Sequence, residues 1–337
     1  MEPEPESKGG TASVMICHTS FGIDASTVEL REVGEIDAAA ISQLTQLVSL
    51  RTLIVNCSWF STDGWRALLR CLRGASVTVL ELSGCNLGPR HAVDLGEYVR
   101  DAGAGTKSLT LSNNFIFGST LEYGGTFGDP VHDVDADGQG WSALCDSFAG
   151  SALATIVMVD IGMGAVGVTS LASSIPAIPH LQELILDSNL ISATERVGWS
   201  YTKTTLDAEL SGLTALCASL ACSAVSRVSF KECWLGPQAL ALISDAIPKM
   251  VALNEFTLDR NPLSAADKAK LLSENIQISR ARLRALEASK LLHDMVGEEC
   301  AHHVDTDALH MHERLCRRLV LVGAPWFELA VKEVAVK

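Results

Sequence analysis

One spacing of apolar residues recurs along the chain, and it fits neither a helix nor a strand of steady alternation. In "LQELILDSNLI", residues 181–191, the apolar places are Leu181, Leu184, Leu186 and Ile191, with Asn189 at the turn place. Six further segments carry this spacing; they begin at Leu50, Val77, Thr106, Leu153, Val225 and Leu253. An eighth, degenerate copy covers 28–36. Such repetition predicts one stacked array in place of two separate domains.

The register of the copies is regular. The turn places are residues 58, 85, 114, 161, 189, 233 and 261, so four of the six steps lie within one residue of 28. The other two steps are 47 and 44 residues long. They indicate insertions at about 118–140 and 192–209.

Each copy has a physical interpretation. The central residues predict a short strand whose two apolar side chains point inward while their neighbours point outward. A turn-place Asn or Cys then satisfies backbone groups. Glycines such as Gly64 are expected to permit the turn that follows. Helices are expected in "GWRALLRCL", "AVDLGEYV", "VTSLASSI" and "QALALISDAI", which carry apolar residues at three-to-four spacing.

The repeats resemble the leucine-rich-repeat superfamily, and specifically its ribonuclease-inhibitor-like class. The turn place alternates as in that class: Cys85, Asn114, Ile161, Asn189, Cys233, Asn261. Ile161, Ser58 and the two insertions depart from the pattern. The resemblance implies an α/β solenoid, a horseshoe of about 7–8 repeats with an inner parallel sheet and outer helices. It divides the chain into a disordered acidic tail (1–12), the solenoid (13–275) and a helical C-terminal cap (276–337).

In that family the concave sheet is the usual contact surface, so the outward strand positions are the predicted partner-binding residues. They are Ile54, Asn56, Glu81, Ser83, Thr110, Ser112, Val157, Val159, Ile185, Asp187, Ser229, Lys231, Thr257 and Asp259. Val157, Val159 and Ile185 are expected side by side. Exposed apolar side chains grouped in this way mark a contact site; the alternative is that an inserted loop covers them.

The first insertion contains Asp133, Asp135, Asp137 and Gly138, the first half of a calcium loop. The place that needs a bidentate Glu is Leu144, so a solvated acidic loop is the favoured interpretation. The second insertion carries Trp199 and Tyr201. These aromatics either anchor an interface or pack back on the array.

The C-terminal region leaves the repeat. Leu283, Leu286, Leu291 and Met295 are spaced for one helix face, and Arg280, Arg282 and Arg284 form a basic cluster. The cluster is either a solvated face or a docking site for an acidic partner. Farther on, Cys300, His302, His303, His310, His312 and Cys316 gather without a complete zinc framework, so a cap is favoured over a metal site.

Composition narrows the functional classes. The net charge of −14 disfavours nucleic acid and anionic membranes as partners. No run of residues is apolar enough to span a bilayer, and the acidic start is no secretion signal. Ten scattered cysteines without a CxxC pair indicate reduced thiols in the cytoplasm.

No catalytic motif stands out. A nucleophile elbow, a phosphate loop and a zinc-protease motif are lacking, and the glycines of "DIGMGAVG" are explained by the repeat turn. We therefore expect a protein that is not an enzyme, binds no cofactor or metal, and acts as an interaction scaffold. Fold analogy favours a subunit of a cytoskeletal, flagellar or ciliary assembly. The alternatives are a GTPase regulator that resembles Ran GTPase-activating proteins and an enclosure-type enzyme inhibitor.

Overall fold

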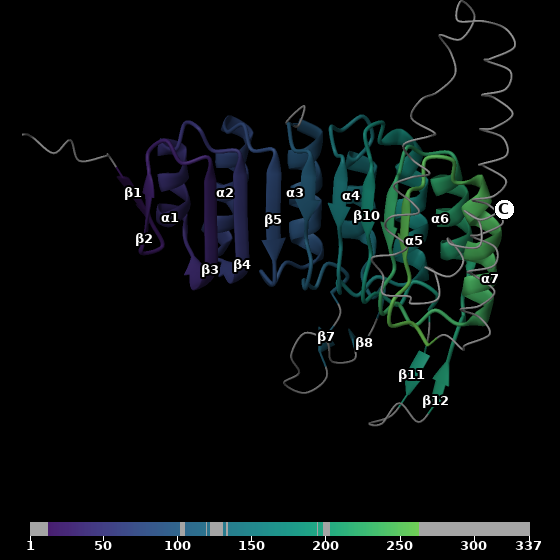
Figure 1. The fold of residues 1–337 in the computed structure, drawn as a ribbon. Helices are drawn as coiled ribbons and strands as arrows, with labels where there is room; N and C mark the ends of the chain where they lie inside the picture. The colour runs from purple at the N-terminus through teal and green to yellow at the C-terminus, as the bar shows by residue number, and fades with distance from the viewer. Residues whose placement is uncertain are drawn as a thin grey trace, which may run out of the picture.

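The computed structural model describes residues 13–101, 105–118, 120–121, 131–132, 134–193, 195–197 and 203–262. Within them the chain is a mixed α/β array that runs from one end to the other in sequence order (Figure 1). A parallel sheet of eight strands forms one layer, and seven α-helices form the other.

The sheet contains one strand from each predicted copy, including the degenerate copy at 28–36. Its order is β14-β13-β10-β9-β6-β5-β4-β3, and every neighbouring pair is parallel. The strands are β3 (Thr27–Ile36), β4 (Thr52–Phe60), β5 (Val79–Ser83), β6 (Ser108–Thr110), β9 (Thr155–Val157), β10 (Glu183–Ile185), β13 (Arg227–Ser229) and β14 (Glu255–Thr257).

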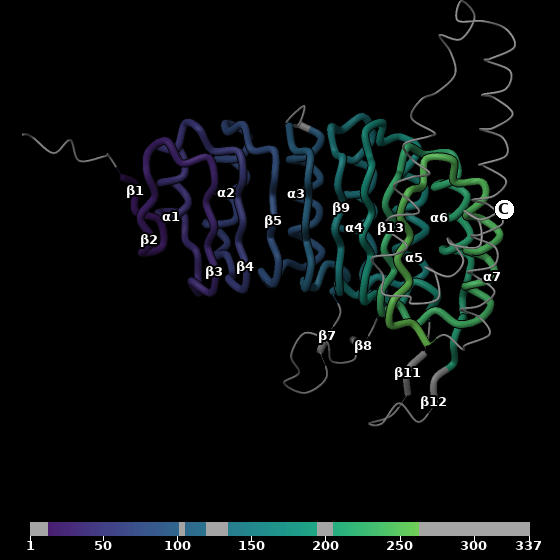
Figure 2. The backbone as a smooth tube through the Cα atoms, in the orientation of Figure 1, coloured from purple at the N-terminus to yellow at the C-terminus, as the bar shows by residue number. Residues whose placement is uncertain are grey.

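The helices follow the strands one by one and pack against their neighbours in the array (Figure 2). They are α1 (Ala38–Ser42), α2 (Thr62–Gly74), α3 (Pro89–Asp101), α4 (Gln139–Ser147), α5 (Ala165–Ser174), α6 (Ser211–Ala221) and α7 (Pro237–Ala246). Three short 3₁₀ helices are η1 (Gln43–Gln46), η2 (Ile175–Ala177) and η3 (Ile247–Lys249). All four helices predicted from the sequence are confirmed.

The core lies between the two layers. The inward strand side chains of neighbouring units, such as Leu80, Leu109, Ile156 and Leu184, are completely buried. They stack in register across the sheet, with Leu109 opposite Ile156 and Ile156 opposite Leu184. Since no unit closes its own apolar face, burial of these side chains depends on the neighbouring units.

The turn-place asparagines satisfy backbone groups, as predicted, and the structure shows that some of these groups belong to the preceding unit. Asn189 accepts backbone N–H bonds from Ile161 and Met163 of the preceding unit, each at 3.2 Å. It donates to the carbonyl oxygens of Met158 and Leu186, at 2.6 and 2.9 Å. Asn114 and Asn261 make equivalent bonds. Cys85 and Cys233 donate instead to a carbonyl of the unit before.

The predicted role of Gly64 is wrong. It lies within α2, and a Cβ atom there would stand 2.1 Å from the carbonyl oxygen of Ile36. Gly140 and Gly212 hold the equivalent places in α4 and α6, with the same close approach to Pro89 and Ala165. Close approach of the first helical turn to a backbone carbonyl of the preceding unit, and not turn conformation, requires glycine at these positions.

Three antiparallel hairpins add to the array. The hairpin of β1 (Ser13–Ile16) and β2 (Thr19–Gly22) buries Val14 and Ile16 at the N-terminal end, and the sequence analysis missed it. The two insertions form β7 (Thr120–Leu121) with β8 (Val131–His132), and β11 (Glu195–Val197) with β12 (Lys203–Thr205). Both project from the same edge of the array (Figure 1).

Candidate protein-binding face

The face of the sheet opposite the helices carries three rows of side chains, which we name by their order along each strand. The first row is Thr52, Val79, Ser108, Thr155, Glu183, Arg227 and Glu255. The middle row is Ile54, Glu81, Thr110, Val157, Ile185, Ser229 and Thr257. The last row is Asn56, Ser83, Ser112, Val159, Asp187, Lys231 and Asp259. The middle and last rows were predicted from the sequence and the first row was not, although alternation by two predicts it equally.

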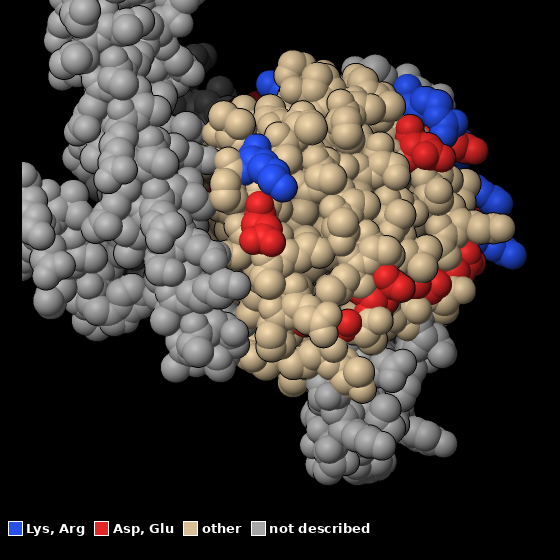
Figure 3. All heavy atoms as spheres, turned by 90° about the vertical axis from the view of Figure 1, so that its right-hand side faces the viewer, with Lys and Arg blue, Asp and Glu red and all other residues tan. Residues whose placement is uncertain are grey.

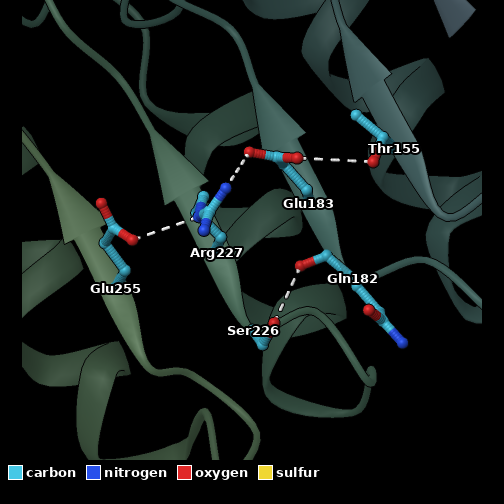
Figure 4. Close-up of polar contacts among 6 residues, drawn as sticks. All are labelled: Thr155, Gln182, Glu183, Ser226, Arg227 and Glu255. Carbon is cyan, nitrogen blue, oxygen red and sulfur yellow. Dashed lines mark hydrogen bonds and ion pairs between the residues drawn. The ribbon is translucent and has the colours of Figure 1, made fainter. Parts of the chain in front are cut away.

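The first row contains a continuous polar ladder over four strands (Figure 4). The Arg227 guanidinium donates to Glu183 Oε1 at 2.7 Å and to Glu255 Oε2 at 3.1 Å. Thr155 donates to the other Glu183 oxygen at 3.4 Å. The bond to Glu183 is the largest of the effects that raise the pKa of Arg227. The ladder therefore keeps a fixed sequence of charges: negative, positive, negative.

The last row repeats that sequence of charges without the same pairing. Asp187 accepts a bond from the backbone N–H of Lys231 at 2.9 Å. The Lys231 ammonium group and the exposed Asp259 carboxylate make no ion pair within the described residues. Close by, Arg260 donates to Glu232 at 2.9 Å. The exposed Lys231 and Asp259 charges of the last row are thus available to a partner.

The predicted apolar cluster lies on β9 and β10, in the middle row and, with Val159, in the last row. Val157 and Ile185 are directly opposite each other on β9 and β10, as expected, and Val159 follows at the end of β9. All three side chains are half-buried. Their remaining exposure leaves aliphatic surface open in the middle of the face.

Two predicted contact residues are not accessible. Ser112 is 7% exposed and accepts a bond from the backbone N–H of Val159. Ser229 is 6% exposed, and its hydroxyl has no hydrogen-bond partner within the described part of the chain. These serines are short, so the longer side chains around them cover them. Both are therefore corrected from contact residues to covered parts of the face.

The first insertion ends in a helix cap, and the prediction of a solvated loop is wrong for Asp135. Its carboxylate accepts backbone N–H bonds from Gly164, Val166 and Gly167 at 2.8 to 3.1 Å. Burial raises the pKa of Asp135, and the three N–H donors oppose that shift. Because the carboxylate fills the N-terminus of α5, the glycines of "DIGMGAVG" bind this aspartate as such a terminus would bind a phosphate. Asp137 accepts a bond from the Gln139 N–H, and Asp133 lies outside the described residues.

The second insertion ends in the same way. Asp207 is 9% exposed and accepts N–H bonds from Gly236, Gln238 and Ala239 at the N-terminus of α7. Each insertion is thus fixed to the helix that follows the next strand. No feature of the loop sequences alone predicts this contact. Trp199 and Tyr201 lie outside the described residues.

The two insertions belong to two similar segments. Residues 134–190 and 206–262 align without a gap and are identical at 18 of 57 positions. The shared positions include Asp135 and Asp207, Gly140 and Gly212, and Asn189 and Asn261. Two outward carboxylates are also shared: Glu183 with Glu255, and Asp187 with Asp259.

The end of the array beyond α7 shows a broad area with few charged side chains, and acidic and basic groups gather along its margin (Figure 3). The described chain reaches this end at Pro262. The predicted cap, the cluster of Arg280, Arg282 and Arg284, and the candidate zinc ligands Cys300, His302, His312 and Cys316 all lie outside the described residues.

The described residues hold no cluster of three or more potential metal ligands. Several buried thiols have a raised pKa because burial disfavours the thiolate; the pKa of Cys217 rises to about 12. Among the helices that the structure describes, none is long and apolar enough to cross a membrane.

No protein-family model and no curated protein sequence matches the chain. Among solved structures, an internalin from Listeria monocytogenes is 12% identical over 75% of this chain and 88% of its own, with a TM-score of 0.19. A similarity of that size supports no argument, so the functional proposal rests on the array itself.

Proposed function

We propose that the protein is a non-enzymatic interaction scaffold that binds another protein through the outward face of its sheet. The observation that carries the proposal is the aliphatic pair Val157 and Ile185, open in the middle row of the face, with Glu183 and Asp187 on either side of Ile185. An apolar centre with a polar surround is the usual arrangement of a protein contact. The charged rows supply orientation and the apolar centre supplies affinity.

The chemistry of the described residues supports binding over catalysis. Asp135 and Asp207 serve as helix caps, and the thiols with raised pKa are core residues. A nucleophile needs the opposite environment, one that lowers its pKa. Asp135, Asp207 and these thiols therefore have structural roles.

The proposal also covers the class of repeat, the contact regions and the cellular setting. We propose a ribonuclease-inhibitor-like horseshoe of about 7–8 repeats with a helical cap over 276–337. The concave face, the insertions and the C-terminal extension would contact partners in a multi-protein cytoplasmic assembly, with a cytoskeletal, flagellar or ciliary setting as the fold analogy. Neither nucleic acid nor a membrane is a proposed partner.

The test is affinity purification of the tagged full chain from its native cells, with the stoichiometry of companions measured by mass spectrometry. Val157→Asp and Ile185→Asp should remove a stoichiometric companion, because each places a charge in the apolar centre. Thr62→Asp, at an exposed position on the helical side, is the matched control. Thermal melts followed by circular dichroism should be nearly unchanged in all three variants.

Retention of the companion by both face variants would contradict the proposal. A solitary protein, or one that carries only a substoichiometric GTPase and accelerates its GTP hydrolysis, would favour a regulator instead. Tight one-to-one binding to a basic enzyme, weakened by salt, would favour an inhibitor.

A further inference from the structure

The first two strands of the sheet, at the N-terminal end of the array, are longer than the others (Figure 1). β3 has ten residues and β4 nine, whereas the other strands of the sheet have three to five. After a shift in register, the added part pairs Gly34 with Ser58 and Glu35 with Trp59. The buried Ser58 hydroxyl fixes this part, because it accepts the backbone N–H of Val33 at 3.1 Å. The longer strands thus carry Trp59 beyond the regular repeat.

Trp59 is the largest of the exposed apolar side chains in the part of the chain that the structure describes, and it is 50% exposed. Its neighbours along the strand, Ser58 and Phe60, are buried or packed on the core, so alternation directs Trp59 and the opposite Glu35 outward. Apart from its chain neighbours, a Cβ atom at Gly34 would meet only Trp59, at 3.9 Å. On the other side, β5 pairs with β4 no farther than Asn56. The indole is therefore open to a ligand.

The strand beside Trp59 is acidic. The exposed charged residues of 27–37 are Glu29, Arg31, Glu32, Glu35 and Asp37. The only cation among them, Arg31, is paired with Glu29. Glu32 and Glu35 make no ion pair among the described residues. An open indole with carboxylates next to it favours a cationic ligand.

The chemistry of the two side chains favours arginine among the cations. A cation over the face of an indole is attracted by the negative potential of the ring. The guanidinium group is planar, so it stacks on an aromatic ring and binds a carboxylate through two N–H donors, whereas the lysine ammonium group is a compact charge that does neither as well. A neutral apolar partner would bury Glu35 without an opposite charge, which is unfavourable.

We propose that Trp59 and Glu35 form a binding site for an arginine side chain of a partner protein. The guanidinium group would stack on the indole and donate to the Glu35 carboxylate, and Glu32 would add negative potential. In the order of the sheet, β4 is three strands from β9 with its Val157, about 14 Å at 4.8 Å per strand. The inference therefore goes beyond the proposed function: it adds a contact outside the aliphatic centre, and neither contact depends on the other.

The test is ¹⁹F NMR of the full chain labelled with 5-fluorotryptophan and titrated with acetylated tri-arginine amide. The chain has six tryptophans, and Trp59→Phe identifies the signal of Trp59. That signal should move saturably, whereas the signals of the buried Trp65 and Trp141 should stay in place. Glu35→Gln should weaken binding about threefold, the size of an exposed ion pair. Glu97→Gln, at an exposed position on α3, is the matched control and should leave binding unchanged.

Two further peptides separate stacking from bulk attraction to an acidic chain. Tri-lysine amide keeps the charge without the planar group, and tri-citrulline amide keeps the planar group without the charge. Both, acetylated, should move the Trp59 signal less than tri-arginine at equal concentration. An unmoved Trp59 signal, equal shifts with tri-lysine, or equal binding by the wild type and Glu35→Gln would overturn the proposal. This outcome is independent of the partner experiment, because Val157→Asp can remove a companion while the Trp59 signal stays unmoved.

Discussion

The most informative comparison in the molecule is between residues 134–190 and residues 206–262. The two segments share their helix caps, helix glycines and turn asparagines, but their outward side chains differ. Asp135 and Asp207 each cap a following helix, and Gly140 and Gly212 each allow close helix packing. Their first strands differ on the outward face. Thr155, Val157 and Val159 of one segment correspond to Arg227, Ser229 and Lys231 of the other.

The comparison separates folding from recognition. The aspartate, glycine and asparagine positions that contact backbone groups of a neighbouring unit are the same in both segments, since an unsatisfied buried peptide group is costly in either place. The outward side chains of β9 and β13 do not have to satisfy buried backbone groups. We infer that the apolar β9 face and the cationic β13 face are where the two segments acquired separate binding roles.

The largest expected loss of stability comes from substituting the glycines that both segments share at the start of a helix. Gly140→Ala and Gly212→Ala should each lower the free energy of unfolding by about 3 kcal/mol, because the new Cβ would meet a backbone carbonyl at 2.1 or 2.2 Å. Chemical denaturation followed by circular dichroism measures this. Gly74→Ala, where a Cβ meets nothing within 4 Å, is the control and should be neutral or slightly stabilising. Similar stability of all three variants would disprove the packing account.

The contribution of the turn-place asparagine to stability should differ between the two segments. Asn189→Ala should cost about 3 kcal/mol of unfolding free energy and Asn261→Ala about 2, because Asn189 satisfies two backbone N–H groups and Asn261 one. Urea titrations give both values. The control is Asn254→Ala, which removes a buried side-chain oxygen that has no partner in the described residues. A larger loss at Asn254 than at Asn189 would contradict this order.

The two aspartate caps should follow with smaller effects. Asp207→Ala should lower the free energy of unfolding by about 2 kcal/mol and Asp135→Ala by about 1, because Asp207 is buried whereas Asp135 is only partly buried. Thermal melts of the two variants suffice. Ala136→Gly and Ala208→Gly, at exposed positions next to each cap, serve as controls. Equal losses would mean that burial does not set the strength of these caps.

The smallest effect on stability should come from exchange of the outward surfaces. Arg227→Thr, Ser229→Val and Lys231→Val together give β13 the face of β9. The free energy of unfolding should change by less than about 1 kcal/mol, because the Arg227 side chain is 41% exposed and its ion pairs are screened by solvent. Partner binding should nevertheless fall. A large loss of stability would show that the ladder holds the sheet together.

Much of this fold could be predicted from spacing alone. Repeat copies spaced about 28 residues apart predicted eight strands, four of the helices and the hydrogen bonds of Asn114 and Asn189 to the backbone. Strict periodicity predicts them because it reflects identical packing in each unit. The N-terminal hairpin of β1 and β2 was missed because it belongs to no repeat. The role of Gly64 was mistaken because the close approach of α2 to the Ile36 carbonyl at the end of β3 is a tertiary contact, which local sequence does not express.

The binding face was harder to predict. Alternation gives the direction of a side chain but not its accessibility, so Ser112 and Ser229 were named although their neighbours cover them. The first row was left out, and with it Arg227, whose partners on β10 and β14 are 44 and 28 residues away in sequence. Asp135 resembled part of a calcium loop because the carboxylate oxygens that accept backbone N–H bonds here are also the ligands that calcium takes.

The most direct test of the central claim is carboxyl footprinting of the full chain with and without its co-purified partner. Mass spectrometry would compare the labelling of Glu81, Glu183, Asp187, Glu255 and Asp259 on the sheet face with that of Asp63, Glu97, Asp146 and Asp245 on the helical layer. The account predicts that the partner protects the first group and leaves the second unchanged. Protection confined to the helical carboxylates would contradict it.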